Sequence, residues 1–381
     1  RGYRLVLEHP WSLRAMLVPP TDLNVGECYV TGVFDVEGTM IPALRDVASL
    51  MDDVTLKTQL RSALDVLRLP APPGRRRGRV AELVGRQHSL ERDAQAIQHH
   101  YDVGNDFYRL FLDQRLVYSC AYFAPGDDDL DRAQERKLDL VCRKLRLTAG
   151  ERFLDIGCGW GALVIHAAKH YGVRALGVTL SEAQHELARK RIADEGLEEL
   201  VEVRLQDYRE IAGQFDAVAS VGMVEHVGAD HLEGYFSRCY DLTAPGGRFL
   251  NHGITTGQRD EVRDFTKDTD SFVGRYVFPD GALVPAYTSV RQLEQAGFEL
   301  VDVQQLRRHY ARTLTHWVRR LESNADRARE VAGEGSYRTW RAYMSGSVVG
   351  FESGDLGVVQ ILGSKDADLP LGRDWMQPHV I

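Results

Sequence analysis

The sequence predicts an α/β protein built on a doubly wound, mainly parallel β-sheet, and two observations carry this prediction. Apolar runs of strand length alternate with segments of helical period over most of the chain. A glycine-rich segment, residues 155–161, directly follows one such run and precedes a helical segment that begins near Ala162. Alternating strands and helices favour parallel pairing, and a glycine loop at a strand–helix junction is typical of nucleotide-binding sheets.

Seven apolar runs are the candidate strands. The first five lie at residues 152–156, 175–179, 201–205, 217–221 and 248–252. A helical insertion at about 306–352 separates the last two, at 300–304 and 356–362. Because each run precedes or follows a helical pattern, helices are expected on both faces of the sheet.

Residues 1–69 predict a separate small α/β domain, which ends in an amphipathic run at 56–69. Proline and glycine at 70–74 are followed by an arginine run at 75–79, typical of an extended linker. The arginines are either a solvated part of that linker or a contact to anionic lipid worth roughly 1 kcal/mol per residue. We expect a small domain at 1–69, a linker at 70–90 and the main domain at 91–381.

Composition bounds the function. The net charge of −8 over 381 residues argues against a nucleic-acid partner, which would need a broad basic face. Five irregularly spaced cysteines without a CxxC pair favour a reducing compartment and no metal site. No apolar run reaches the about 18 residues of a membrane span, and the N-terminus lacks the pattern of a secretory signal. A cytoplasmic protein is expected.

The glycine loop indicates a cofactor site. Gly157, Gly159 and Gly161 allow a sharp turn and close approach of a ligand, with helix N–H groups pointing at it. Asp155, two residues earlier, can meet an ammonium group. The loop also satisfies GxGxxA, so a dinucleotide site stays open on the loop alone. However, the second strand ends at 178–181 without the acid that usually binds the ribose diol of a nicotinamide cofactor. Hydroxyls and Gln184 would do that work.

Polar residues also follow the third and fourth strands. Gln206, Asp207 and Tyr208 end the third, and residues 222–226 end the fourth. Open α/β sheets bind ligands at the carboxyl ends of parallel strands, so these groups are expected to converge there. Asp207 alone would more often be a helix N-cap.

These segments resemble the cyclopropane fatty-acid synthases and the related mycolic-acid methyltransferases. The resemblance rests on residues 100–108, 118–123, 154–161, 178–181, 206–209, 222–228, 275–281 and 309–314. It runs from about 95 to 362, with a weaker match to the small lipid-binding domain of the phospholipid-acting members. It implies a Rossmann-like class I fold of S-adenosylmethionine (SAM)-dependent methyltransferases with a helical insertion, joined to an N-terminal lipid-binding domain.

The resemblance also implies SAM as cofactor and a bicarbonate ion beside the reacting carbon. It assigns cofactor contacts to Tyr118, Ser119, Gly157, Gly159, Thr179, Gln184, Gln206 and Asp207. The loop and the strand ends add Asp155, Trp160, Gly161, Ser181 and Tyr208 as candidates. The residues implied around the bicarbonate, and hence the catalytic set, are Cys120, Glu225, His252, Ile254 and Tyr310.

The implied reaction adds the SAM methyl group across the double bond of an unsaturated phospholipid acyl chain and closes a cyclopropane ring. The family further implies a homodimer in peripheral contact with the inner face of the membrane. Methyl transfer to the double bond generates a carbocation, which water would trap, so the site must be dry. The new methyl group must lose a proton before the ring closes, so the site must also hold a weak base. Bicarbonate can serve if it donates its proton to Glu225 and accepts from His252, Tyr310 and the N–H groups of Cys120 and Ile254. Expected walls of the acyl tunnel are Tyr122, Phe123, Phe272, Tyr276 and Tyr287.

Other interpretations stay open. Singly, His252 is more often a structural histidine, Cys120 a small buried hydrophobe and Tyr310 a packing residue. The nearest alternative function is the same transfer giving a methylene- or methyl-branched chain. A lipid carrier without chemistry and a nicotinamide enzyme are more distant alternatives, and a test of SAM or NADH binding separates them.

Overall fold

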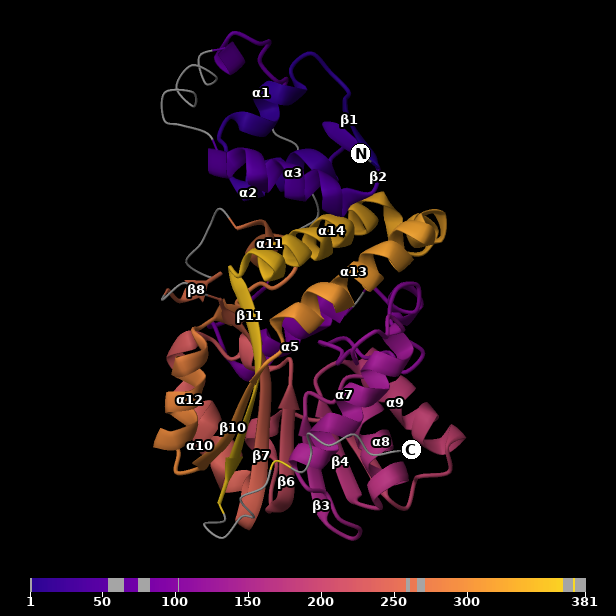
Figure 1. The fold of residues 1–381 in the computed structure, drawn as a ribbon, viewed down its shortest axis with the longest axis vertical. Helices are drawn as coiled ribbons and strands as arrows, with labels where there is room; N and C mark the ends of the chain where they lie inside the picture. Colours follow the sequence, from indigo (N-terminus) through magenta and orange to yellow (C-terminus); the bar gives the residue numbers. More distant parts are fainter. Residues whose placement is uncertain are drawn as a thin grey trace.

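The structure is a computed structural model that describes residues 2–53, 65–74, 83–101, 103–257, 261–265, 271–365 and 373. Figure 1 shows three parts from top to bottom: a small N-terminal part in indigo, a pair of long helices in orange and yellow, and a sheet flanked by helices. None of the described helices combines the length and apolar character required to cross a bilayer.

A seven-stranded sheet organises the lower part. Its strands are β3 (Arg152–Ile156), β4 (Arg174–Thr179), β5 (Val201–Leu205), β6 (Phe215–Val221), β7 (Thr243–Thr256), β10 (Glu299–Gln305) and β11 (Leu356–Ser364). The order is β10-β11-β7-β6-β3-β4-β5, and β11 runs antiparallel to both of its neighbours. The four other pairings are parallel. The predicted doubly wound, mainly parallel sheet is confirmed, with β7 longer than expected at both ends.

Helices cover both faces of this sheet. Helices α7 (Leu130–Lys144), α8 (Ala162–Tyr171) and α9 (Glu182–Asp194) pack on one face, and α10 (Leu232–Leu242) and α12 (Ala286–Gln295) on the other. Side chains of Asp129 and Ser181 accept backbone N–H groups at the starts of α7 and α9. The helix predicted to begin near Ala162 is confirmed as α8.

The predicted insertion is a helical hairpin at the carboxyl ends of the parallel strands. Helix α13 (Arg307–Ser323) packs along α14 (Ala325–Ser353), which is interrupted at Gly333. Figure 1 shows both helices lying across the upper end of the sheet. Their buried side chains, including Trp317 and Trp340, share a core with α6 (Asn105–Tyr108) and its surroundings. Helix α5 (Leu90–Tyr101) precedes α6 and lies below the hairpin.

The N-terminal part has its own small core. Strands β1 (Tyr3–Leu7) and β2 (Phe34–Gly38) pair antiparallel, beside α1 (Ser12–Leu17), α2 (Asp22–Val30) and α3 (Met40–Asp53). Helices α2 and α3 pack against α14, and α2 also contacts the short helix α11 (Phe272–Tyr276). A small α/β N-terminal part was thus predicted correctly, whereas its exact boundaries stay a prediction. Most of the amphipathic run, residues 54–64, and the arginines at 75–79 lie outside the described residues.

Short elements complete the chain at the edge of the site. They are the 3₁₀ turns η1 (Tyr208–Glu210), η2 (Val224–His226) and η3 (Ala229–His231), and the two-stranded sheet of β8 (Arg263–Asp264) and β9 (Ala282–Leu283). Turns η1 and η2 directly follow β5 and β6, so they carry residues of the predicted site.

Candidate active site

Two cavities adjoin at the carboxyl ends of the parallel strands. The first, which we call the loop cavity, has a volume of about 430 Å³ and is lined by the glycine loop and the ends of β3 to β6. The second, the insertion cavity, has a volume of about 450 Å³ and lies between β7, η2 and the hairpin of α13 and α14. Five residues line both cavities: Tyr101, Tyr118, Ser119, Gly222 and His226. The two spaces therefore meet at one shared wall.

Glycine backbone forms the floor of the loop cavity. Gly157 and Gly159 have φ values of 77° and 54°, in the left-handed region that favours glycine. A Cβ at Gly157 would press against the Met223 side chain, whereas one at Gly159 would project into open space. The close approach of a ligand that the loop predicted is therefore possible at Gly159.

A buried acid and a buried cation lie beside this loop. Asp155 is 2% exposed, and its Oδ1 has no hydrogen-bond partner in the described part of the chain. Burial raises the pKa of Asp155 to about 7, and the nearby Lys137 opposes that rise. Lys137, also 2% exposed, donates from Nζ to Ser119 Oγ at 2.8 Å, and burial lowers its pKa to about 8. The unpartnered carboxylate oxygen fits the predicted contact to an ammonium group.

Sequence reasoning missed Lys137, although a signal was present. The buried face of α7 includes Leu130, Ala133 and Val141 at helical spacing, and Lys137 falls on the same face. A lysine inside an apolar stripe is unusual because desolvation of its charge is unfavourable. It therefore indicates a polar partner in the interior, here Ser119.

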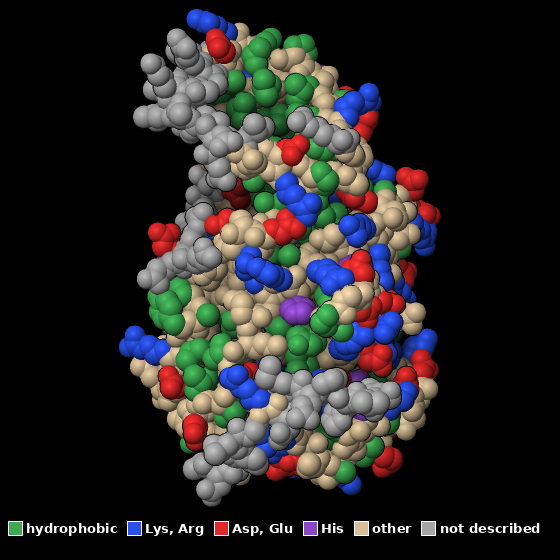
Figure 2. Space-filling model, in the orientation of Figure 1, with side chains coloured by type: hydrophobic (Ala, Val, Ile, Leu, Met, Phe, Trp, Pro, Cys, Tyr) green, Lys and Arg blue, Asp and Glu red, His purple; other side chains and the backbone are tan. Residues whose placement is uncertain are grey.

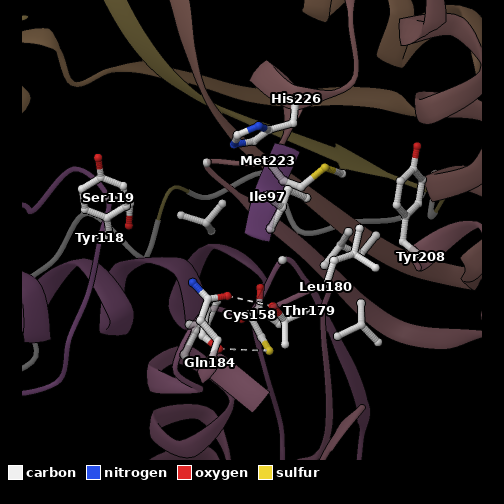
Figure 3. A pocket seen from close by; sticks show the side chains of 18 of the residues that line it. Ile97, Tyr118, Ser119, Cys158, Thr179, Leu180, Gln184, Tyr208, Met223 and His226 are labelled. Carbon is white, nitrogen blue, oxygen red and sulfur yellow. Dashed lines mark hydrogen bonds between the residues drawn. The ribbon is translucent and has the colours of Figure 1, made fainter. Parts of the chain in front are cut away.

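The other predicted cofactor residues are distributed around the loop cavity. Figure 3 shows Tyr118 and Ser119 on one side, Tyr208 on the opposite side, and Thr179 with Gln184 between them. Thr179 Oγ1 donates to Gln184 Oε1 at 2.7 Å, which joins the two side chains expected to replace an acid at this strand end. Eleven of the thirteen candidates line the cavity, namely Tyr118, Ser119, Asp155, Gly157, Gly159, Trp160, Thr179, Gln184, Gln206, Asp207 and Tyr208.

Gly161 and Ser181 do not line this cavity. Gly161 precedes α8 with a φ of 80°, and Ser181 caps α9 by accepting the Gln184 N–H. Asp207 lines the cavity, but its carboxylate is already bound by Arg209 and caps η1. Its capping role, expected for an isolated Asp, is therefore present together with its place in the site.

Helix α5 covers the loop cavity and was not predicted to do so. His88 and Asp93 lie near its start, Ile97 in its middle and Tyr101 at its end, and all four line the cavity. Arg209 joins α5 to the sheet by ion pairs to both Asp93 and Asp207. The motif at residues 100–108 was visible in the sequence, but only the fold shows that the preceding helix closes the site.

All five predicted catalytic residues line the insertion cavity: Cys120, Glu225, His252, Ile254 and Tyr310. Glu225 is 9% exposed, and its Oε1 accepts the backbone N–H of Ile254 at 2.6 Å. Its Oε2 has no partner among the described residues. Burial raises the pKa of Glu225 to about 7, against the hydrogen bond from Ile254. The Ile254 N–H, expected to donate to bicarbonate, thus donates to Glu225 in this structure.

His252 presents one ring nitrogen without a partner. Its Nδ1 lies 3.2 Å from Nε2 of Gln360, while its Nε2 is buried and unpaired within the described ranges. Burial holds the pKa of His252 well below its usual range, with Lys137 and Lys144 acting in the same direction. The ring is therefore neutral at physiological pH.

Tyr310 and Cys120 complete this wall. The Tyr310 ring packs against Phe351 with centroids 4.7 Å apart and meets Trp317 edge to face. The Cys120 thiol is buried and lies 3.8 Å from the Leu306 carbonyl. Burial raises the pKa of both groups, so each is protonated at neutral pH.

The aromatic residues predicted as walls of an acyl tunnel lie outside the lining of the insertion cavity. None of Tyr122, Phe123, Phe272, Tyr276 and Tyr287 lines the insertion cavity. Tyr122 and Phe123 stack on His309, the α11 aromatics pack toward α2, and Tyr287 is 59% exposed. The aromatic rings that do line it are Tyr101, Tyr118, Phe265, Phe278, Tyr310, Tyr343 and Phe351. Proximity in sequence to the motifs did not indicate which ring faces the cavity.

Comparisons with known proteins agree with this geometry. Residues 88–361 match the family model described as "Mycolic acid cyclopropane synthetase". The chain is 40% identical over 372 residues to a "Probable fatty acid methyltransferase" of Pseudomonas putida, covering 96% of this chain and 89% of that protein. It is 35% identical over 269 residues to the cyclopropane-fatty-acyl-phospholipid synthase of Escherichia coli, with 71% and 67% covered. A structure of mycolic acid cyclopropane synthase CmaA1 complexed with SAH and CTAB is 31% identical and superposes with a TM-score of 0.66. That superposition covers 71% of this chain and 98% of CmaA1.

The matched residues include every lining residue of both cavities except Asp22, which belongs to the N-terminal part. The family predicted from the motifs is thereby confirmed, and so is the class I methyltransferase fold. The chain belongs to the mycolic acid cyclopropane synthetase family and is a SAM-dependent fatty acid C-methyltransferase of that family.

Proposed function

We propose that this protein transfers the methyl group of SAM to the double bond of an unsaturated phospholipid acyl chain and, with bicarbonate-assisted deprotonation, forms a cyclopropane ring. The observation that carries the proposal is the shared wall of the two cavities. Tyr101, Tyr118 and His226 face the glycine loop and Asp155 on one side. On the other side they face the space that holds Glu225 and the rings of the helical hairpin. A methyl donor and a hydrocarbon chain could thus meet there away from water.

The loop cavity provides the groups that SAM requires. Asp155, beside Lys137 and Ser119, would bind the amino-acid ammonium group, and Thr179 with Gln184 would bind the ribose hydroxyls. When bound there, SAM supplies an electrophilic methyl group. Helix α5 would exclude water from that group, because its residues close the cavity over the loop.

The insertion cavity provides a place for a small anion that acts as a base. The unpaired Oε2 of Glu225 is an acceptor, His252 Nε2 is buried without a partner in the described part of the chain, and Tyr310 lines the same space. Bicarbonate would supply a weak base there. Glu225 would accept its proton, and His252 and Tyr310 would donate to its other oxygens. Ile254 contributes by holding the Glu225 carboxylate in place through its N–H.

The N-terminal part would contact the lipid surface. Leu5, Leu7, Leu17, Val18 and Val47 are 39–54% exposed on it, and Figure 2 shows apolar side chains on its visible face. Asp22 of the same part lines the insertion cavity. We infer peripheral contact with unsaturated phospholipid at the inner face of the membrane, from a cytoplasmic location. All five cysteines are free and buried, which fits a reducing compartment.

A homodimer is also part of this proposal, on the family resemblance. Sedimentation of the purified protein tests it, and a single species of monomer mass across the working concentration range would exclude it.

The central test is an assay of the lipid product. The protein is incubated with SAM, bicarbonate and vesicles of unsaturated phospholipid, and the acyl chains are identified by mass spectrometry and proton NMR. High-field cyclopropyl protons are expected. Vinylidene protons would instead show the alternative function, the same methyl transfer giving a methylene-branched chain, and a saturated methyl branch would show its reduced form. The Pseudomonas putida relative, which matches 96% of this chain, is named only as a probable fatty acid methyltransferase, which favours neither product. Recovery of unchanged lipid with every substrate tried would reject both.

A further inference from the structure

Gln360 is a buried polar residue that contacts one of the candidate catalytic residues, His252. It lies on β11 directly opposite His252 of β7 in the antiparallel pairing. Its side chain is 0% exposed, and its amide Nε2 lies 3.2 Å from His252 Nδ1. Gln360 lines neither cavity. Among the described residues, its side-chain amide makes no other hydrogen bond that would account for its burial.

The hydrogen-bond partner of His252 Nδ1 determines whether the other ring nitrogen, Nε2, carries a proton. A neutral imidazole carries one N–H and one lone pair, on different nitrogens. An amide N–H that donates to Nδ1 requires the lone pair there, so the proton resides on Nε2. That Nε2 is the unpaired atom of His252, which lines the insertion cavity. Because burial keeps the ring neutral, its tautomer and not its charge decides its role.

We propose that Gln360 is a positioning residue that fixes His252 as the Nε2–H tautomer, so that the ring offers a hydrogen-bond donor to an anion in the insertion cavity. The identity of that anion as bicarbonate rests on the function proposed above. Rotation of the amide would offer Oε1 to an Nδ1–H and leave a lone pair in the cavity. That lone pair would share the space with the Glu225 carboxylate, so an anion would meet two acceptors.

Nitrogen-15 NMR of the full-length protein measures the tautomer directly. The ring nitrogens of His252 are assigned by their loss in His252→Asn. The wild type is expected to show a protonated Nε2. In Gln360→Glu the carboxylate can only accept, so the proton should move to Nδ1. In Gln360→Met, which keeps the volume but lacks donors, both tautomers should appear. Gln304→Glu is the matched control. Gln304 lies on β10 opposite Gln360 of β11, one strand further from His252. The His252 spectrum of this variant should be unchanged.

Turnover gives the second readout. Both Gln360 variants should lose about 10–100-fold in kcat with unchanged SAM affinity, by analogy with groups that orient a metal-ligating histidine. If Gln360→Glu does not fold, the wild-type spectrum and the Gln360→Met variant still test the proposal. A wild-type ring protonated at Nδ1, or Gln360→Met with wild-type kcat, would overturn the proposal. If the spectra are as expected but the wild type makes no modified lipid, the proposed function fails while the assignment to Gln360 stands.

Discussion

The backbone N–H of Ile254 donates a 2.6 Å hydrogen bond to Oε1 of Glu225, while Oε2 of the same carboxylate has no partner among the described residues. The two oxygens are therefore unequal. One fixes the side chain to β7, and the other is left for a ligand in a buried space. This asymmetry is what the proposed role of Glu225, orienting a base, requires.

Replacing Glu225 with glutamine should separate catalysis from cofactor binding. The amide oxygen can still accept from Ile254, but the anionic acceptor for a proton is lost. Turnover of vesicle lipid should fall by about 100-fold or more, as for other groups that handle a proton. The SAM dissociation constant, measured by calorimetry, should stay unchanged. Glu233→Gln, at an exposed site on α10, is the control. An equal loss of turnover and SAM affinity would contradict the orienting role.

The same variant should show a pH-dependent gain in stability. Burial raises the pKa of Glu225 to about 7, so the folded state binds its proton more tightly than the unfolded state does. Below the pKa that Glu225 has in the unfolded chain, this carboxyl does not destabilise the native state. The free energy of unfolding then falls as pH rises from there toward 7. Relative to wild type, Glu225→Gln should gain free energy of unfolding between pH 5 and pH 8. Urea denaturation across that range tests this, and a difference that stays flat or shrinks would count against it.

Much of the fold was predictable because apolar periodicity reports burial directly. All seven strands appear where short apolar runs occur, and the hairpin of α13 and α14 fills the expected insertion. Strand length was less predictable. Residues at both ends of β7 contain glycine and polar side chains, and they are strands because β6 and β11 pair with them. That stabilisation comes from tertiary contacts, which local propensity does not contain.

The site was predictable where a motif fixed it and not where packing did. Glu225, His252 and Tyr310 lie far apart in the chain, and the family resemblance brought them together. Lys137 and Gln360 belong to no recognised motif, and their roles depend on which buried atom faces them. The aromatic rings that line the insertion cavity were not predicted for the same reason. The side of an element that a ring occupies follows from packing with distant segments.

Lys137 should influence SAM binding through Asp155. Its ammonium group opposes the rise in the Asp155 pKa, so Lys137→Met should move that pKa further up and weaken the carboxylate as a partner for an ammonium group. SAM affinity should fall about 10-fold at neutral pH, equivalent to about 1.4 kcal/mol, and recover partly as pH rises. Calorimetric titrations at pH 6.5 and 8.5 measure this.

Lys144→Met is the matched control for that experiment. Lys144 is the other fully buried lysine of α7, and it pairs with Asp302 outside both cavities. Its loss should reduce stability, because the buried Asp302 then keeps only its ion pair with Arg373 among the described residues. SAM affinity should not change. Equal effects of the two substitutions on SAM affinity would show that Lys137 acts only through stability.

A bulky residue in the insertion cavity should block lipid and spare SAM. Ser347 lies half-buried on α14 and lines that cavity. A Phe side chain there would occupy space needed by the acyl chain, and turnover should fall about 100-fold, as expected when reacting groups are displaced. SAM affinity should not change. Ser353→Phe, at the exposed end of the same helix, is the control. Wild-type turnover in Ser347→Phe would show that the acyl chain binds elsewhere.

Arg341 should couple the N-terminal part to the methyltransferase fold. This buried side chain donates to the Tyr29 hydroxyl and to the Val36 carbonyl across the interface, and to Glu322 of α13. Arg341→Met leaves Glu322 without that cation and should lower the free energy of unfolding by about 3–5 kcal/mol. The exposed pair of Arg327 and Glu330 provides the comparison, since Arg327→Met should change stability by less than about 1 kcal/mol. Limited proteolysis should then release the N-terminal part of Arg341→Met first, because α2 and β2 lose their hydrogen bonds to this buried side chain of α14. Global unfolding without early release of that part would show that Arg341 stabilises the whole chain and does not specifically hold the N-terminal part.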